Sequence, residues 1–548
     1  MLPGSGGPTR ENGKRGLMGH SDLVGGLLRP EAYPWHPSAV ELVETHVSWV
    51  FLAGDRVVKV KKPVAYGFVD HTTLTRRHQS CTDEVELNRR LTNGVYLGVV
   101  PIVHNDRAGY HVAGEGAPVE WATLMRRLPA ERMLDALLAS GAPPSCLGDQ
   151  LANRLIPFHR DIAALCGGSA TETVAATSAV VKENLEQLEP FADRPLGIVQ
   201  LGLVAEALRS FITERASLLR GRVEAGWIRE GHGDLRAEHV CLEPDGELQI
   251  FDCVEFSRAL RCADVASDLA FLLMDLKRLG APETAATLVA RYREAGVDLP
   301  EALLRFYRAH RALVRAKVDC ISRTSFAGQV ERDTLALEAA GYLDLATAAA
   351  LTVQPSLIAM TGLSGTGKST VATALARALD AAIFASDVVR KELEGQAGPA
   401  PAAWKQDFYT PERTETTYER LWELAAQMLA AGRTTILDAT FLDERRRERL
   451  VAVARTAGVP LVLVETVCGE ETAFGRILAR SRRGDSRSDA TVEVYRRQRA
   501  AVQASPPRVP HGAVHVVVDT DADRTAFLDP VLAALHRKDI IAPQVPGT

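Results

Sequence analysis

From about residue 354 onward, short apolar runs alternate with polar stretches that are long enough to form helices. Each run is nearly continuous and consists of aliphatic or β-branched residues, which is typical of strands buried on both faces of a parallel sheet. The alternation predicts a doubly wound α/β domain. The runs are residues 357–360, 382–385, 435–437, 461–464 and 514–518.

The chain before residue 354 has a mixed pattern. Segments 48–52 and 57–61 flank the turn Ala53-Gly54-Asp55 and predict a β-hairpin. A second hairpin is predicted over 240–251, with its turn at Pro244-Asp245-Gly246, inside an otherwise helical region. We therefore expect this part to be an α+β domain.

Two boundaries follow from composition. Residues 1–25 are rich in Gly, Pro and charge and contain no apolar core of a signal peptide, so we expect a flexible tail. An Ala/Leu-rich helix over 335–351 leads to Gln354-Pro355, where a helix is expected to end. The predicted domains are residues 26–335 and 354–542.

Composition excludes several classes of protein. The 548 residues are 46% hydrophobic and 24% charged, a globular balance, and the net charge of −5 gives no overall attraction to nucleic acid or anionic lipid. The longest core-like run, 270–274, is far too short to cross a bilayer. None of the eight cysteines forms a C-x-x-C pair. We expect a soluble, cytoplasmic protein without a membrane partner.

The sharpest motif is Gly-Leu-Ser-Gly-Thr-Gly-Lys-Ser at 362–369, which matches the P-loop (Walker A) pattern G-x-x-x-x-G-K-[ST]. It follows a predicted strand and precedes a predicted helix over 370–379, as the motif requires. Backbone N–H groups would wrap the phosphates, Lys368 would add a catalytic cation, and Ser369 would bind magnesium. The predicted ATP-binding residues are Gly362, Ser364, Gly365, Thr366, Gly367, Lys368, Ser369 and Thr370.

Two aspartates follow the next strands of the same domain. Asp387 comes after the second strand, where a carboxylate can accept the proton of an acceptor hydroxyl while Arg390 holds substrate or phosphate. A helix N-cap is the alternative role for Asp387. Asp438 ends the third strand and is the candidate Walker-B acid that binds magnesium through water.

An arginine-rich stretch lies further along this domain. Arginines on a lid can stabilise the charge that spreads over the γ-phosphate oxygens during transfer, and a solvated helix face is the alternative for at least two of them. Arg480 and Arg483 are three residues apart, share a helix face and are the predicted ATP contacts. The stretch comprises Arg476, Arg480, Arg482, Arg483 and Arg487.

On these motifs the C-terminal domain resembles the small P-loop kinases, namely the gluconate kinase, zeta toxin and polynucleotide kinase group. The resemblance covers about residues 354–540. It implies ATP as the phosphate donor and a hydroxyl group as the acceptor.

The N-terminal domain carries a second motif, His232-Gly-Asp234-Leu, followed by the predicted hairpin and Asp252. A catalytic aspartate on a loop, a hairpin and a second aspartate form the layout of kinase-like phosphotransferases. Asp234 would orient or deprotonate the acceptor hydroxyl, and Asp252 would bind magnesium.

Upstream residues complete this second site. Lys59 and Lys61 lie on one face of a predicted strand, and Lys59 is our choice for contacting the α- and β-phosphates. Glu84, on a predicted helix over 81–91, is the candidate ion-pair partner, with Glu86 as the alternative. For Lys59 and Glu84 the competing interpretation is an exposed surface charge.

This half resembles the aminoglycoside phosphotransferase family and its choline- and sugar-kinase relatives over about residues 30–330. The resemblance implies a protein-kinase-like bilobal fold, an adenine-contacting segment at 123–129 that includes Met125, and structural acids at Asp264 and Asp268. One position departs from the family: His239, a candidate metal ligand, stands where a magnesium-binding Asn is usual, and no Gly-rich phosphate loop is visible. The order of the two halves resembles bacterial bifunctional aminoglycoside phosphotransferase/ATP-binding proteins.

Three hypotheses follow. The first is a double kinase that uses ATP and magnesium to phosphorylate hydroxyl groups of small molecules such as sugars or aminosugars. The second is one active P-loop kinase with a regulatory N-terminal pseudokinase or sensor domain, which His239 motivates. The third is a nucleic-acid end kinase, suggested by the arginine clusters at 445–449 and 476–487 but disfavoured by the acidic net charge.

Overall fold

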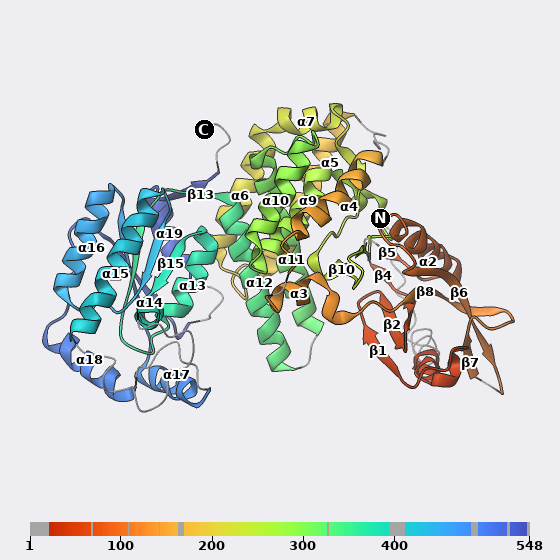
Figure 1. Cartoon of the computed structure of the whole chain (residues 1–548), viewed down its shortest axis with the longest axis horizontal. Coiled ribbons are helices and arrows are strands. Elements are labelled where there is room, and N and C mark those ends of the chain that lie inside the picture. The colour runs from red at the N-terminus through yellow and green to blue at the C-terminus, as the bar shows by residue number, and fades with distance from the viewer. Residues whose placement is uncertain are drawn as a thin grey trace, which may run out of the picture. The chain divides into compact units, whose positions relative to one another are not determined.

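The computed structural model describes residues 21–66, 69–107, 109–141, 143–162, 169–325, 328–393, 411–483, 491–522 and 527–544. The chain divides into two compact units (Figure 1). The N-terminal unit comprises residues 1–167 and 222–300, and the C-terminal unit comprises residues 168–221 and 301–548. None of the described helices is long and apolar enough to cross a membrane.

The N-terminal unit contains an antiparallel sheet with strand order β1-β2-β3-β8-β6-β7. The predicted hairpin is confirmed as β2 and β3, which turn at Gly54 with a positive φ of 68°. The strands are β1 (Val40–Glu44), β2 (Ser48–Ala53), β3 (Arg56–Lys61), β6 (Tyr96–Asn105), β7 (Gly109–Val112) and β8 (Pro118–Arg126), with a separate short pair, β4 (Ala65–Tyr66) and β5 (Val69–Asp70).

Helix α2 (Leu74–Asn88) packs on strands β6 and β8 of this sheet. It begins seven residues earlier than the sequence predicted, because the hydroxyl of Thr73 accepts a hydrogen bond from the backbone N–H of Arg76 and caps the first turn. The prediction of a helix over 81–91 was therefore wrong at both ends. The buried side of α2 carries Cys81, Glu84 and Val85 toward the sheet.

The second predicted hairpin is confirmed as β10 (Val240–Leu242) and β11 (Leu248–Ile250), directly after the short 3-10 helix η4 (Ala237–His239). Helix α9 (Val265–Arg278) is buried along most of its length and forms the centre of this part of the unit. The other elements are α3 (Leu134–Ala139), α4 (Leu147–Asp161), β9 (Ile228–Glu230), α8 (Arg258–Arg261), β12 (Cys262–Asp264) and α10 (Pro282–Glu294).

The C-terminal unit contains a five-stranded sheet in the order β15-β16-β14-β17-β18, in which every neighbouring pair is parallel. This confirms the predicted doubly wound domain, with strands at the five predicted runs. The strands are β14 (Leu357–Thr361), β15 (Ala382–Ala385), β16 (Thr435–Asp438), β17 (Leu461–Val467) and β18 (Val514–Asp519).

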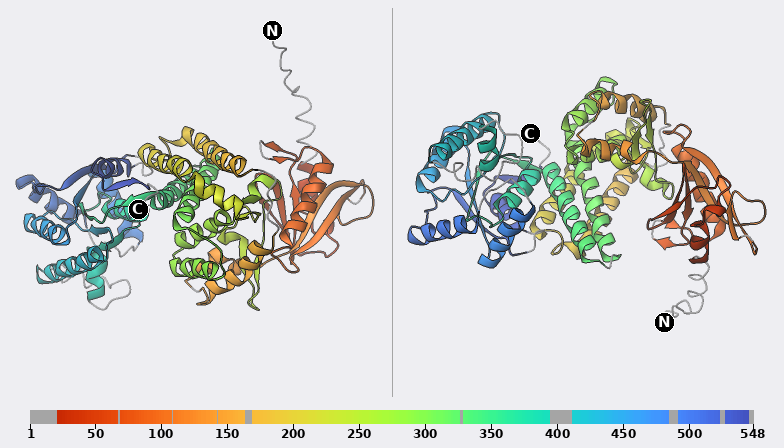
Figure 2. Two further views of the ribbon diagram at one scale, coloured as in Figure 1. Left: turned by 90° about the horizontal axis from the view of Figure 1, so that it is seen from above. Right: turned by 60° about the horizontal axis from the view of Figure 1, so that its bottom comes forward.

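Helices cover both faces of the parallel sheet (Figure 2). They are α13 (Lys368–Leu379), α14 (Ser386–Leu393), α15 (Pro411–Ala430), α16 (Glu444–Ala457) and α19 (Asp529–Arg537). Helices α17 (Glu470–Arg483) and α18 (Val492–Ala504) pack against each other and against Leu363 of the P-loop.

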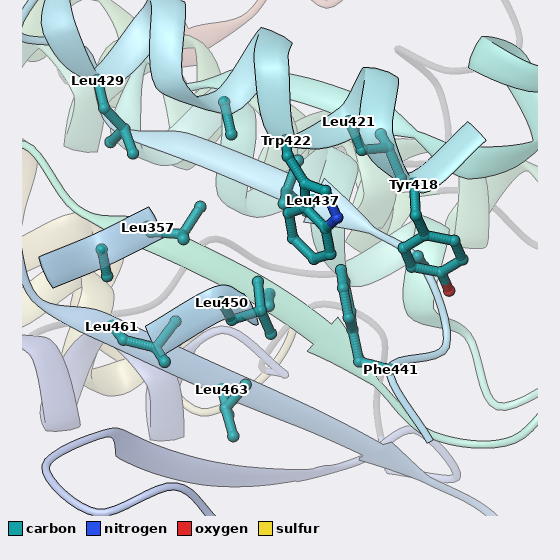
Figure 3. Packing of buried hydrophobic residues seen from close by; sticks show 14 of the residues in the cluster. Leu357, Tyr418, Leu421, Trp422, Leu429, Leu437, Phe441, Leu450, Leu461 and Leu463 are labelled. Carbon is teal, nitrogen blue, oxygen red and sulfur yellow. The ribbon is translucent and has the colours of Figure 1, made fainter. Parts of the chain in front are cut away.

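One face of the sheet packs against α15 and α16 (Figure 3). Alternate residues of β14, β16 and β17 point to this face, and the ring of Phe441 lies against the rings of Tyr418 and Trp422, with centroids 5.6 and 5.8 Å apart. Alternation of side chains along nearly all-apolar strands gives the sheet a second buried face, so the loops at its carboxyl edge rest on a rigid support.

Four further helices belong to the C-terminal unit: α5 (Ala170–Leu188), α6 (Ile198–Glu214), α11 (Glu301–Ser325) and α12 (Gln329–Ala350). Figure 2 shows α11 and α12 side by side. The carboxylate of Asp529 accepts hydrogen bonds from the backbone N–H groups of Val199 and Gln200 and so ties α19 to the start of α6. Strands β13 (Leu351–Val353) and β19 (Ile541–Pro543) pair next to α12.

The family resemblance assigns α5, α6 and α11 to the N-terminal domain. In the structure these helices belong to the same compact unit as the P-loop sheet. Helix α12 continues to Ala350, close to the predicted boundary at Gln354-Pro355. Helix α7 (Ala216–Glu224) spans the division between the two units. The domain limits 26–335 and 354–542 stay a prediction.

Candidate active sites

The P-loop connects β14 to α13 at the carboxyl edge of the parallel sheet. Gly362, Gly365 and Gly367 have φ values of 129°, 85° and 89°, in the region that side chains other than hydrogen disfavour. A Cβ on Gly362 would lie 2.5 Å from the carbonyl oxygen of Thr466, and a Cβ on Gly365 would lie 2.8 Å from that of Ala473. The loop therefore needs glycine at these positions for both backbone conformation and space.

Lys368 is the first residue of α13, two positions before the predicted start of that helix. Its Nζ donates hydrogen bonds to the carbonyl oxygens of Gly362 at 3.1 Å and Leu363 at 2.7 Å. Burial lowers the pKa of Lys368 to about 8, although the carboxylates of Asp438 and Asp387 oppose the shift. The ammonium group thus lies against the loop that would wrap a phosphate chain.

Asp438 ends β16, which lies next to β14, and its backbone pairs in register with Met360. Burial raises the pKa of Asp438, while a hydrogen bond with Ser369 and the charge of Lys368 oppose the rise. Ser369 and Asp438 present only oxygen atoms, the donors that magnesium prefers. These two residues fit a magnesium ion, which would supply positive charge to the β- and γ-phosphates.

The predicted acceptor-side residues lie in α14, directly after β15. Asp387 is in the first turn of that helix, and its carboxylate accepts a hydrogen bond from Arg390 at 3.1 Å. Arg390 is buried, so this ion pair has a defined position beside the sheet edge. The negative charge of Asp387, like that of Asp438, raises the pKa of Lys368. Both aspartates therefore lie within electrostatic range of the P-loop lysine.

Helix α17 carries four of the five predicted arginines. The positive charge of Arg480 lowers the pKa of Lys368, so Arg480 lies within electrostatic range of the P-loop lysine. Arg476 instead donates hydrogen bonds to the hydroxyl and carbonyl of Thr520 at 2.8 and 2.6 Å, which is a structural role. The side chain of Arg483 and the whole of Arg487 lie outside the described residues.

The remaining loop residues have local partners. The Thr366 hydroxyl donates to the Leu363 carbonyl at 2.8 Å and lies 2.7 Å from the hydroxyl of Thr466, and the backbone N–H of Thr370 donates to the Gly367 carbonyl. These contacts hold the loop in shape and leave Thr370 exposed at the start of α13.

One contact to the P-loop was not predicted. The side-chain oxygen of Gln498, on α18, accepts a hydrogen bond of 2.9 Å from the backbone N–H of Ser364. Gln498 is 134 positions away in sequence and stands in an arginine-rich helix without a recognisable motif. No signal in the sequence distinguishes this glutamine.

In the N-terminal unit, Lys59 of β3 lies between two acidic groups. Its Nζ is 2.7 Å from Oε1 of Glu84 and 2.7 Å from Oδ1 of Asp252. Burial alone would lower the pKa of Lys59, but the charges of Asp252 and Glu84 outweigh it and raise the pKa well above its ordinary value. The structure thus brings together Lys59, Glu84 and Asp252. Lys59 and Glu84 are largely buried in an ion pair and are not the exposed surface charges of the competing interpretation.

A second lysine shares the same glutamate, as strand alternation allows. Lys61 is completely buried, and its Nζ lies 3.0 Å from Oε2 of Glu84 and also pairs with Glu255. The hydroxyl of Thr123 donates to the same Oε2 at 2.9 Å. Burial would raise the pKa of Glu84, but Lys59 and Lys61 lower it. Glu255 was missed by the sequence analysis, although it stands only three residues after Asp252.

Asp234 follows a tightly held turn. The carboxylate of Asp268, in the first turn of α9, accepts hydrogen bonds from the backbone N–H groups of His232 at 2.6 Å and Gly233 at 2.8 Å. His159 approaches the same carboxylate at 3.2 Å. These bonds fix the loop that presents the Asp234 side chain, which is about one third exposed.

Two other residues that the family resemblance singled out, Asp264 and Met125, are held by contacts inside the N-terminal unit. Asp264 caps α9 and pairs through both oxygens with Arg222, each bond being 2.8 Å long. Met125 lies in β8 and packs in a cluster with Tyr96, Leu128 and Cys241, at the edge where β8 leads toward η2 (Ala130–Arg132).

His239 closes η4 beside both aspartates. Its Nδ1 lies 2.8 Å from the backbone carbonyl oxygen of Asp234, and its Nε2 lies 3.6 Å from Oδ2 of Asp252. An Asp252 oxygen fits magnesium, but the imidazole nitrogen beside it does not, because magnesium prefers oxygen. Within the described residues, no group of three or more His, Cys, Asp or Glu is arranged to hold a metal alone. A metal held by the described residues of either unit would therefore need further ligands, such as a nucleotide phosphate or water.

Comparisons with known proteins show what the chain and its parts are similar to. Residues 357–505 match the family model described as an AAA domain, which confirms the expected P-loop resemblance of the C-terminal part. Over 464 residues the chain is 32% identical to the uncharacterized protein Rv2004c of Mycobacterium tuberculosis (strain ATCC 25618 / H37Rv), a match that covers 83% of this chain and 88% of that protein.

Solved structures match each part of the chain separately. A gluconokinase from Sinorhizobium meliloti 1021 is 21% identical, covers 34% of this chain and 95% of its own, and has a TM-score of 0.25. The aminoglycoside 2'-phosphotransferase-IIIa, solved as its GDP complex, is 15% identical, covers 60% of this chain and 98% of its own, and has a TM-score of 0.36.

Proposed function

The chain belongs to the family of the Mycobacterium tuberculosis protein Rv2004c, and from the two sites described above we propose that it is an ATP-dependent phosphotransferase with two kinase sites. Each site would transfer the γ-phosphate of ATP to a hydroxyl group of a small molecule such as a sugar or aminosugar. The observation that carries the proposal is that each unit holds a largely buried lysine close to carboxylates at its predicted phosphate site. Lys59 lies 2.7 Å from Asp252, and Lys368 lies within electrostatic range of Asp438 and Asp387.

In the C-terminal unit the chemistry rests on positioning and charge. The loop N–H groups and Lys368 would bind the β- and γ-phosphates, and Ser369 with Asp438 would hold magnesium. Asp387 is the candidate group that accepts the proton of the acceptor hydroxyl, and Arg480 is the candidate that compensates the charge of the transferring group. The buried Arg390 fixes the orientation of Asp387.

In the N-terminal unit the same tasks fall to side chains from distant segments. Lys59, oriented by Glu84, would bind the α- and β-phosphates, and Met125 would contact the adenine. Asp234 would orient the acceptor hydroxyl and take its proton. Asp252 would contribute to the metal site. A cytoplasmic location stays a prediction from composition.

The main alternative is a single active P-loop kinase with an N-terminal sensor. It is motivated by His239, which stands at the expected metal position. A nucleic-acid end kinase has weaker support, because Arg447 of one arginine cluster is buried and donates its hydrogen bonds to Phe441, Pro507 and other groups inside the unit.

The test is ATP consumption against a panel of sugars, aminosugars, aminoglycosides and nucleosides. Wild type, Asp234→Ala and Lys368→Ala are compared in the full chain. Loss of a positioned base lowers turnover by roughly 10²–10⁴-fold, which is the loss expected for Asp234→Ala on its acceptor. Lys368→Ala removes the cation at the β- and γ-phosphates and should abolish activity on a different acceptor. If Asp234→Ala changes nothing while Lys368→Ala removes all turnover, the two-kinase proposal is wrong and the sensor alternative holds.

A further inference from the structure

The tautomer of His239 is fixed by the backbone. Its Nδ1 lies 2.8 Å from the carbonyl oxygen of Asp234, and a carbonyl oxygen can only accept, so Nδ1 carries the hydrogen. A backbone carbonyl oxygen that accepts from the other ring nitrogen is a usual way to orient a metal-binding imidazole. In the neutral ring the lone pair is then on Nε2.

The lone pair of Nε2 faces another acceptor. Oδ2 of Asp252 is 3.6 Å away, while Oδ1 of the same carboxylate is taken by Lys59 at 2.7 Å. The nearby carboxylate of Glu238, 3.5 Å from Nε2, is engaged by Arg236. Two acceptors that face each other repel unless a metal ion lies between them or Nε2 carries a proton. A metal about 2.1 Å from each donor can bridge atoms up to about 4.2 Å apart, so the observed separation allows it.

The donor pair differs from that of the P-loop site in the same chain. Ser369 and Asp438 offer oxygen only, which suits magnesium. His239 and Asp252 offer one imidazole nitrogen and one carboxylate oxygen, and imidazole favours divalent transition metals over magnesium. The two units therefore present sites with different metal preferences.

We infer that the N-terminal site binds a divalent transition metal through Nε2 of His239 and Oδ2 of Asp252, with nucleotide phosphates and water as the remaining ligands. The inference rests on the proposed nucleotide binding by this unit. In this inference His239 is a metal ligand that replaces the usual Asn. Its presence is then no sign that the domain is inactive.

The experiment uses full-length Lys368→Ala protein, in which the P-loop site is weakened, with Mn²⁺ and a non-hydrolysable ATP analogue. Pulsed electron paramagnetic resonance detects a directly bound imidazole through its ¹⁴N coupling to Mn²⁺. Protein labelled with ¹⁵N distinguishes histidine from the nitrogens of the adenine. The matched control adds His239→Asn, which restores an oxygen donor of similar size.

We expect imidazole coupling in the first protein and its loss in the His239→Asn control. Because the asparagine offers an oxygen donor that also suits Mn²⁺, the metal can stay bound in the control, and the lost coupling then reports the lost imidazole ligand alone. Mg²⁺ binding should be unchanged or stronger in His239→Asn, which shows that the control folds and separates lost ligation from lost structure.

Two results overturn different statements. If the analogue and Mn²⁺ bind but no imidazole coupling is seen, Nε2 carries a proton instead of a metal, and the inference fails while nucleotide binding stands. If the Lys368→Ala protein binds no nucleotide at all, the proposed nucleotide binding by the N-terminal unit is wrong. The inference about the metal then loses its premise.

Discussion

A buried aspartate in the C-terminal unit makes a measurable prediction about stability. Asp344 of α12 accepts a hydrogen bond of 3.0 Å from Gln200 of α6, and its other oxygen lies 3.2 Å from Arg377 of α13, the helix that follows the P-loop. Burial raises the pKa of Asp344 to about 7, and Gln200 and Arg377 oppose the rise without cancelling it.

The sign of the pH effect follows from the direction of the shift. A carboxyl group whose pKa is raised in the folded protein favours the folded state at low pH, and this contribution is lost as the pH rises from its unfolded pKa of 3.8 through about 7. At 1.36 kcal/mol per pKa unit, the full loss is about 4 kcal/mol. The part that falls between pH 5 and pH 8 is about 2.5 kcal/mol.

Asp344→Asn removes the titration and keeps an oxygen acceptor for Gln200. Relative to this variant, the wild type should lose about 2.5 kcal/mol of stability between pH 5 and pH 8. Hydrogen exchange of the buried β14 amides, measured by mass spectrometry across that range, reports the opening free energy of this unit. Asp333→Asn, at an exposed position of the same helix, is the matched control and should follow the wild type.

Parallel pH profiles of wild type and Asp344→Asn would refute the reasoning. They would mean that the ion pair with Arg377 keeps Asp344 charged at neutral pH, in which case Asp344→Asn should also be less stable than wild type at pH 8.

Three further substitutions test packing and loop geometry. Phe441→Ala empties the ring position against Trp422 and should lower the unfolding free energy by about 3–5 kcal/mol in chemical denaturation. Arg222→Met leaves the buried carboxylate of Asp264 without its cation and should cost about 3–5 kcal/mol, measured in the same way. Gly365→Ala strains the P-loop and should abolish titratable ATP binding at that site while far-ultraviolet circular dichroism stays unchanged.

The sequence predicted the C-terminal sheet well because its strands are locally encoded. Each strand is a short apolar run, and the glycines of the loop stand within six residues of one another, where their positive φ values are needed. Gln498 escaped prediction because its contact with Ser364 depends on the return of α18 to the sheet edge, which no local pattern records.

The division into units was harder to predict. Helices α6 and α12 have ordinary apolar faces, and nothing in a single helix states which sheet it will cover. The hydrogen bonds from Val199 and Gln200 to Asp529 join segments more than 300 residues apart. Placement of residues 168–221 is thus a property of the tertiary structure.

The two proposed phosphate sites show why motifs reveal one kind of site better than the other. In a P-loop, backbone N–H groups wrap the phosphates, so the constraint falls on neighbouring glycines and leaves a compact pattern. In the N-terminal unit, the charges come from β3, α2 and the segment after β11, and each lysine there needs a carboxylate because it is buried. Lys61 and Glu255 balance each other only in the folded chain. The sequence could indicate the lysine and the aspartate, but the charge balance that orients them becomes visible only when the strands and the helix are placed together.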